Sequence, residues 1–126
     1  MEELKLTLEQ EFLVQKNMLS ISSLSLDDLR AYIIQKFQES CLQQTKMTFL
    51  AGESYGIPPS KELKALVYKG ALSLNQELDL TNLKMIVNNS IDMEPLKQLA
   101  FDICRQIIVR KIVFDKVINN KSGFIV

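Results

Sequence analysis

The sequence repeats itself, and this internal repeat constrains the fold more than any other feature. The segment Leu6-Thr7-Leu8-Glu9-Gln10-Glu11-Phe12 matches Leu72-Ser73-Leu74-Asn75-Gln76-Glu77-Leu78, and after one extra residue in the second copy the frame holds to the end. The later pairs in this frame are Leu29 with Leu96, Met47 with Phe114, Leu50 with Val117 and Gly56 with Gly123. Because a repeat is one structural unit that buries its face on its neighbour, we expect two related units packed together.

The first copy contains a long amphipathic helix, which we expect from Ser25 to about Tyr55. Ser25 is a good N-cap residue, and acidic residues follow it in the first turn, where the helix dipole favours negative charge. Gly56 and the following Pro58-Pro59 end the helix. The residues that give it an apolar stripe, at spacings of three and four, are Leu26, Leu29, Ile33, Phe37 and Cys41.

The second copy predicts a matching long helix from Asp92 to about Asn120, with Pro95 in its first turn. A shorter helix precedes each long one. Thr7-Leu8-Glu9-Gln10 and Ser73-Leu74-Asn75-Gln76 both have the form of a capping box, in which the two side chains bond to each other's backbone N–H groups. The chain therefore reads as short, long, short, long.

A helical hairpin of this length cannot bury its apolar face alone, so the two copies most simply pack on each other. We predict an all-α fold in which tandem helical hairpins form a four-helix bundle, as a covalent pseudo-dimer. The single domain covers residues 1–126, with hairpins at 6–57 and 72–124 and a linker at 58–71. Within the linker, Ser60 to Tyr68 has helical propensity and forms either a linking turn or an extension of the third helix.

Composition excludes several classes of function. The 126 residues contain no His, the commonest general base and metal ligand, so an enzyme, a metal site and a cofactor are all unsupported. Lys plus Arg equals Asp plus Glu at 15 each, which leaves no cationic field to hold a nucleic acid. The two cysteines, Cys41 and Cys104, lie among apolar helical neighbours and are expected to be buried, reduced core thiols.

Neither secretion nor membrane insertion is expected. The chain begins with acidic residues where a signal peptide needs a basic flank. The most apolar stretch, residues 107–114, is broken by two adjacent cations and is much shorter than the roughly 20 residues of a membrane helix. We therefore expect a soluble protein.

The first copy resembles the NblA-like family, small proteins of phycobilisome degradation in cyanobacteria and red-algal plastids. The resemblance rests on Leu6-Thr7-Leu8-Glu9-Gln10-Glu11-Phe12, on Tyr32-Ile33-Ile34-Gln35-Lys36-Phe37 and on Ser54-Tyr55-Gly56-Ile57. Twelve residues separate the first of these from Ser25, as in the family. The match covers residues 6–57 in register and returns more faintly over 72–124. Family members are usually about half this length and pair as homodimers of helical hairpins.

The resemblance implies a non-enzymatic adaptor that binds phycobiliproteins of the phycobilisome and brings in a Clp-type chaperone and protease. It also implies the cytoplasm of a cyanobacterium or the plastid stroma as the compartment. The family places antenna contacts on a Leu, here Leu50 and Val117, and on a Lys two residues later. The Lys position holds Gly52 and Asn119, which departs from the family.

The candidate partner-binding residues are near the ends of the long helices. They comprise apolar anchors and, in the last helix, an excess of cations that would steer docking onto an acidic phycobiliprotein. Core packing is the alternative role of the apolar residues, and a solvated or complementary face is that of the cations. The candidates are Met47, Leu50, Tyr55, Arg110, Lys111, Phe114, Lys116, Val117 and Lys121.

Two other functions remain open from the sequence. One is a structural or assembly protein that binds a phycobiliprotein or another photosynthetic complex without recruiting a protease, which the missing Lys favours. The other is an unrelated helical interaction scaffold. Further homo-oligomerisation is compatible with each of them.

Overall fold

The computed structural model describes the backbone of residues 7–125 and the side chains of residues 7–118. This part of the chain is all-α, with five helices and no strand, which confirms the predicted fold class. The helices are α1 (Leu8–Ser22), α2 (Leu26–Ser54), α3 (Lys61–Lys69), α4 (Leu74–Asn89) and α5 (Met93–Ile125).

The helix starts follow from their cap residues. Thr7 and Ser73 each form the predicted capping box, with the side chain accepting from the backbone N–H three residues on. Ser25 accepts from the Asp28 N–H in the same way, and Asp92 Oδ1 accepts from the Glu94 N–H at 3.3 Å. These bonds satisfy amides that have no partner inside the helix, and so they fix where each helix begins.

The connecting segment forms a helix of its own, α3. Ser60 caps its start by accepting from the Leu63 N–H, and Gly70 ends it in the left-handed conformation at φ +59°. Gly56 likewise has φ +72° after α2, in the region that side chains with a Cβ rarely adopt. Gly123, its counterpart in the repeat, does not end α5, which continues to Ile125.

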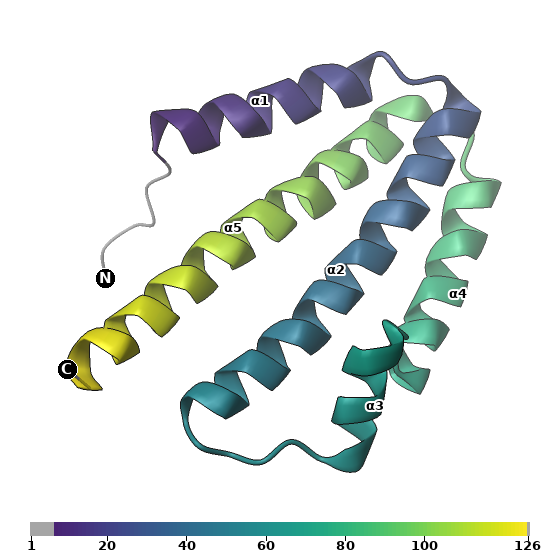
Figure 1. Ribbon diagram of the computed structural model, residues 1–126. Helices are drawn as coiled ribbons and strands as arrows, with labels where there is room; N and C mark the ends of the chain where they lie inside the picture. Colours follow the sequence, from purple (N-terminus) through teal and green to yellow (C-terminus); the bar gives the residue numbers. More distant parts are fainter. Residues whose placement is uncertain (1–6, 126) are drawn as a thin grey trace.

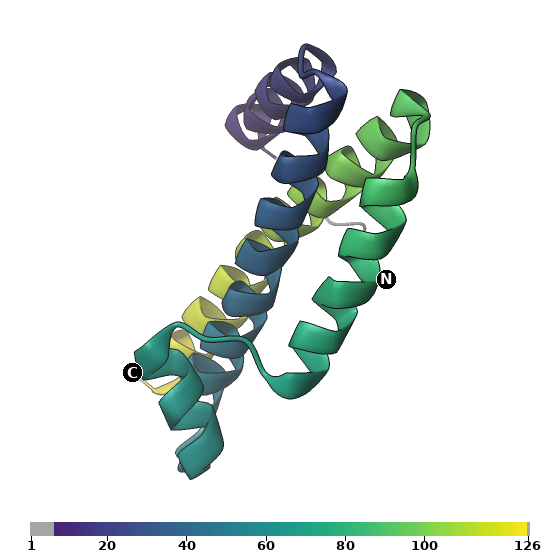
Figure 2. The same ribbon diagram turned by 90° about the vertical axis from the view of Figure 1, so that its right-hand side faces the viewer.

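The two long helices form the centre of the molecule. α2 and α5 lie side by side and run in the same direction from a common end (Figures 1 and 2). α1 packs on α5 and α4 packs on α2, so each short helix covers the long helix of the other repeat. Within each repeat the short and long helices diverge from their connecting turn (Figure 1).

The main core is at the common end, where the two short-to-long turns lie. Ile21, Leu29, Ile33 and Val87 are its largest fully buried side chains, and the start of α5 completes it. Partly buried hydrophobic residues, among them Tyr32 and Phe37 of α2, pack against this cluster. The helices are therefore held tightly at one end and separate toward the other.

Burial follows the repeat around the main core. Four pairs of corresponding positions are buried in both copies, which is expected if a pseudo-two-fold axis relates the copies there. The buried pairs are Val14 with Leu80, Ile21 with Val87, Leu29 with Leu96, and Ile33 with Ala100. Polar pairs follow the same rule, since Asp27–Arg30 and Glu94–Lys97 form equivalent salt bridges at the starts of the long helices.

Arg30 also joins the two repeats at the core end. Its Nη2 donates to the Ser90 carbonyl at 2.6 Å, just beyond the end of α4. A cation at a helix C-terminus stabilises the exposed carbonyls there. Within the described residues, none of the helices combines the length and the apolar character needed to cross a bilayer.

Both cysteines are buried and free, as predicted. Burial raises the pKa of the Cys41 thiol, Asp79 adds to the effect, and Arg110 opposes it. Burial likewise raises the pKa of Tyr32, and its hydrogen bond with Cys104 adds to that effect. The Cys41 thiol and the Tyr32 hydroxyl therefore stay protonated at neutral pH.

The raised pKa makes Cys41 a slow nucleophile. In a Cys104→Ala background, we expect iodoacetamide to label Cys41 slowly at mildly alkaline pH and much faster in urea, read by mass spectrometry. Since the folded thiol has the higher pKa, its contribution to stability is present below the ordinary thiol pKa of about 8.5 and is lost as the pH rises through the folded value. Equal labelling rates with and without urea would contradict this assignment.

The core cluster predicts a sharp contrast between two isoleucines. Ile33→Ala should lower the free energy of unfolding by about 2–5 kcal/mol, because it leaves a cavity in a fully buried site. Ile91→Ala is the matched control, since Ile91 is 82% exposed, and it should change that free energy by less than about 0.5 kcal/mol. Urea unfolding followed by circular dichroism measures both, and similar values for the two would contradict the placement of the core.

Candidate partner-binding site

A seam of facing residues runs along the two long helices. At the spacing of a parallel coiled coil, α2 contributes residues 40, 43, 47 and 50 and α5 contributes 107, 110, 114 and 117, which correspond pairwise in the repeat. We define the layers of the seam by the pairs that the repeat aligns, which are Ser40 with Ile107, Gln43 with Arg110, Met47 with Phe114, and Leu50 with Val117. The side chains of each layer decide whether that layer is closed or is open to a partner.

The first two layers are closed by hydrogen bonds that cross between the helices. Gln43 Nε2 donates to the Ile107 carbonyl at 2.9 Å, and Arg110 Nη1 donates to the Ser40 carbonyl at 3.4 Å. These two bonds are equivalent under the pseudo-two-fold axis. Arg110 Nη1 also donates to Ser40 Oγ at 2.8 Å and to Gln43 Oε1 at 3.2 Å. The Arg110 guanidinium is therefore hydrogen-bonded within the chain. Arg110 is half-buried, and its role is structural rather than that of a free docking cation.

The last two layers are open. Leu50 is 37% exposed and Val117 is 46% exposed, so the helices no longer cover each other at this end. A cavity of about 270 Å³ lies between them, and we call it the interhelical cleft. It is lined by Gln43, Lys46, Met47, Leu50, Lys111, Phe114 and Asp115.

The cleft brings together four of the nine candidate residues: Met47, Leu50, Lys111 and Phe114. Lys46 on α2 and Lys111 on α5 give each wall one exposed cation. Lys111 Nζ lies 3.3 Å from Asp115 Oδ2, and both side chains are more than half exposed. Such exposed pairs contribute little to stability and exchange partners at low cost. The cleft is thus a mainly apolar hollow whose polar rim carries two cations, Lys46 and Lys111, and one anion, Asp115.

The other candidates lie elsewhere. Lys116 and Val117 are exposed on α5 beside the cleft but are not part of its lining. Tyr55 borders a separate hollow of about 400 Å³ between the end of α2, the loop containing Pro58-Pro59, and α3. The side chain of Lys121 lies outside the described residues.

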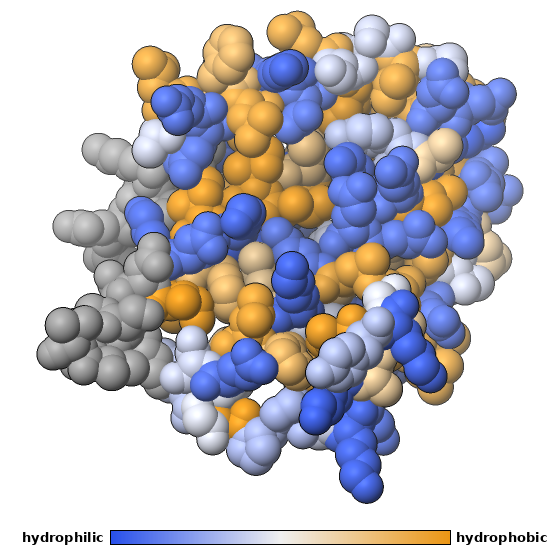
Figure 3. All heavy atoms as spheres, viewed as in Figure 1, coloured by the Kyte–Doolittle hydropathy of each residue, from blue (hydrophilic) through white to orange (hydrophobic). Residues whose placement is uncertain are grey.

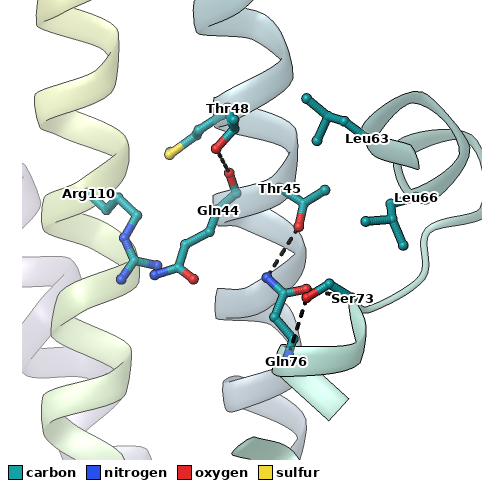
Figure 4. Close-up of a pocket in the computed structure, with 9 residues that line it drawn as sticks. Gln44, Thr45, Thr48, Leu63, Leu66, Ser73, Gln76 and Arg110 are labelled. Atoms are coloured by element: carbon teal, nitrogen blue, oxygen red, sulfur yellow. Dashed lines mark hydrogen bonds between the residues drawn. The ribbon is translucent and has the colours of Figure 1, made fainter. Parts of the chain in front are cut away.

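A third hollow lies along α2 between α3, α4 and α5, and two of the candidate residues, Met47 and Arg110, are part of its lining. It is shallow, about 630 Å³, and Leu63 and Leu66 of α3 point into it toward α2 (Figure 4). Gln76 of α4 forms part of its wall, donating to the Cys41 carbonyl at 3.1 Å and to Thr45 Oγ1 at 3.3 Å. The final third of α2 is therefore bordered by more than one hollow.

Sequence reasoning missed Gln43, Lys46 and Asp115, and it missed the contribution of α3. The signal for the first three was the alternating spacing of three and four in both long helices, which places them at or beside the seam. The position of α3 carried no such signal, because its packing against α2 is a tertiary contact.

Gly52 lies where the family resemblance implies a lysine. Its carbonyl accepts from the Ile57 N–H at 2.8 Å as the chain turns back at the end of α2. A Cβ at this position would lie 3.4 Å from the Ile57 carbonyl oxygen. The position is thus part of the turn that ends α2.

The described residues include no group of three or more cysteine or acidic side chains placed to hold a metal ion. Comparisons with protein-family models, with curated proteins and with solved structures find no match to this chain.

The seam predicts different roles for two adjacent cations. Arg110→Ala should lower the free energy of unfolding by about 1–3 kcal/mol, because it removes the bonds to Ser40 and Gln43 and the packing of the aliphatic stem. Lys111→Ala, whose side chain is 69% exposed, should change it by less than about 0.5 kcal/mol. A double-mutant cycle with Ser40→Ala should give a coupling of at least about 0.5 kcal/mol. Additive effects of Arg110→Ala and Ser40→Ala would exclude the cross-helix bond.

Proposed function

We propose that this chain is a non-enzymatic adaptor that binds a phycobiliprotein in the interhelical cleft and promotes its degradation by a Clp-type chaperone and protease. The observation that supports binding is the cleft itself, where apolar side chains from both long helices meet beneath exposed lysines. The partner and the protease come from the resemblance to the NblA-like family. The corresponding compartment is the cytoplasm of a cyanobacterium or the plastid stroma.

The chemistry of the cleft suits an acidic protein surface. Met47 is adaptable in shape, and Phe114 offers a large apolar face, which are the properties of docking anchors. Lys46 and Lys111 would steer an acidic partner and fix its orientation, contributing more to association rate and specificity than to affinity. Phycobiliproteins are generally acidic, and the two lysines of the rim outnumber its one acidic residue, Asp115, so the net charge of the rim is positive.

One observation favours the second candidate, a structural or assembly protein that binds a phycobiliprotein without recruiting a protease. Gly52 replaces the lysine expected from the family, and it participates in the turn at the end of α2. A chain that retains the apolar cleft but lacks that cation would keep an antenna contact of a different kind.

The cleft predicts which side chains, when replaced by alanine, weaken binding of the phycobiliprotein. Leu50→Ala and Phe114→Ala should each raise the Kd for a purified phycobiliprotein by about tenfold or more, as for truncated interface anchors. Ile91→Ala removes a comparable exposed side chain at the core end and should bind like the parent chain. The immobilised protein is loaded with phycobiliprotein at low and moderate salt, and retained bilin absorbance in the visible is measured.

The outcomes separate the candidate functions. No retention at either salt concentration contradicts every antenna-binding function and leaves an unrelated interaction scaffold. Retention that Leu50→Ala and Phe114→Ala leave unchanged excludes the cleft as the binding site. If the immobilised protein retains phycobiliprotein, Clp chaperone, protease and ATP are then added. A shorter lifetime of the phycobiliprotein supports the adaptor, and an unchanged lifetime supports the structural protein.

A further inference from the structure

Each short helix carries an apolar stripe on the side that faces away from the rest of the chain. On α1 this first outer stripe consists of Leu8, Phe12 and Leu19, which are 84%, 69% and 75% exposed. On α4 the second outer stripe consists of the corresponding residues, Leu74, Leu78 and Met85. Figure 3 shows hydrophobic side chains along the upper edge of the molecule, where Figure 1 places α1.

The stripe on α1 is separate from the face that packs on α5. At 3.6 residues per turn, Leu8, Phe12 and Leu19 point in nearly the same direction, roughly 150° away from the buried Val14 and Ile21. A helix that is apolar on two opposite sides is one that is covered on both sides. Within the part of the chain that the structure describes, only the inner side of α1 is covered.

Among residues 7–118, the exposed apolar residues outnumber the buried ones. Sixteen large hydrophobic side chains are exposed in this range, against eleven buried hydrophobic residues. Single exposed leucines are ordinary, but aligned exposed stripes mark contact surfaces.

We propose that the first outer stripe is a self-association surface, on which α1 pairs in antiparallel orientation with α1 of a second copy of this chain. In that pairing Leu8 faces Leu19 of the second copy, and the two Phe12 rings pack near the two-fold axis. Phe12 is the largest side chain in either outer stripe, which makes the α1 stripe the better anchored of the two.

The charges beside the stripe identify a second copy as the occupant. Glu9 and Lys16 lie two turns apart on the same flank of the stripe, and both are exposed. Neither forms a salt bridge within the described part of the chain. Antiparallel helices related by a two-fold axis place the same flank of each helix together, so Glu9 meets Lys16 of the second copy, twice per dimer.

The same charges disfavour a parallel pairing. Glu11 lies on the opposite flank at nearly the same level as Glu9. Parallel helices bring opposite flanks together, so Glu9 would meet Glu11 of the second copy, and like charges in contact are destabilising. The pattern on α1 is therefore complementary to itself in one orientation only.

The test is the oligomeric state of the full chain, measured by sedimentation equilibrium over a range of concentrations. The parent chain should be a dimer that dissociates on dilution. Phe12→Lys should raise the dimer Kd by at least about tenfold. Leu78→Lys places the same charge in the second outer stripe and should leave the Kd unchanged. A parent chain that stays monomeric throughout would overturn the proposal, as would dissociation caused by Leu78→Lys and not by Phe12→Lys.

A charge exchange provides a second test that does not depend on the apolar residues. Glu9→Lys and Lys16→Glu should each weaken the dimer, and the double variant Glu9→Lys/Lys16→Glu should restore it. Failure of the double variant to restore association would exclude the antiparallel pairing. Circular dichroism checks that each variant keeps its helices, and phycobiliprotein binding by Phe12→Lys shows that this surface is independent of the cleft.

Discussion

The pairing of α2 with α5 is the interaction on which the rest of the structure depends. Both helices start at the same end and run in the same direction, and crossed hydrogen bonds from Gln43 and Arg110 hold their middle sections in register. Once this register is fixed, the two short-to-long turns come together at the common end. The apolar surface nearest to each short helix is then the long helix of the other repeat. The swapped cover of α1 on α5 and α4 on α2 is thus a consequence of the central pair.

The seam is buried at one end and open at the other, so the residues that stabilise the fold differ from those that are available for binding. At the common end Leu29, Ile33, Leu96 and Ala100 are buried, and the short helices close over them. The middle is held by polar side chains, which specify register more than they add net stability. At the far end neither short helix covers the seam. The open layers there need not hold the fold together, so their side chains are available for a partner.

The sequence was most informative where local chemistry decides the structure. Cap residues and periodicity predicted the starts of the helices and the extent of α2 closely, because capping and amphipathic spacing act within a few residues. The repeat predicted that two related units pack together, and four pairs of positions that it aligns are buried in both copies. Sequence reasoning did not reveal which helix each short helix would cover, since α1 has apolar residues on two sides and either side suits a long helix. Nor did it reveal the internal bonds of Arg110, because an arginine in a helix has the same local signature whether it faces solvent or a neighbouring helix.

The fusion of two repeats into one chain has a consequence for the cleft that a homodimer does not share. In a homodimer the two walls of a site on the two-fold axis are identical, so a partner can dock in two equivalent orientations. Here the walls differ: Met47 faces Phe114, the repeat counterpart of Lys46 is Val113, and that of Lys111 is Gln44. The apolar floor keeps the two-fold pattern while the charged rim does not. Because rim charges set orientation more than affinity, this divergence would allow the two repeats to hold one partner in one orientation, which a dimer of identical chains cannot do.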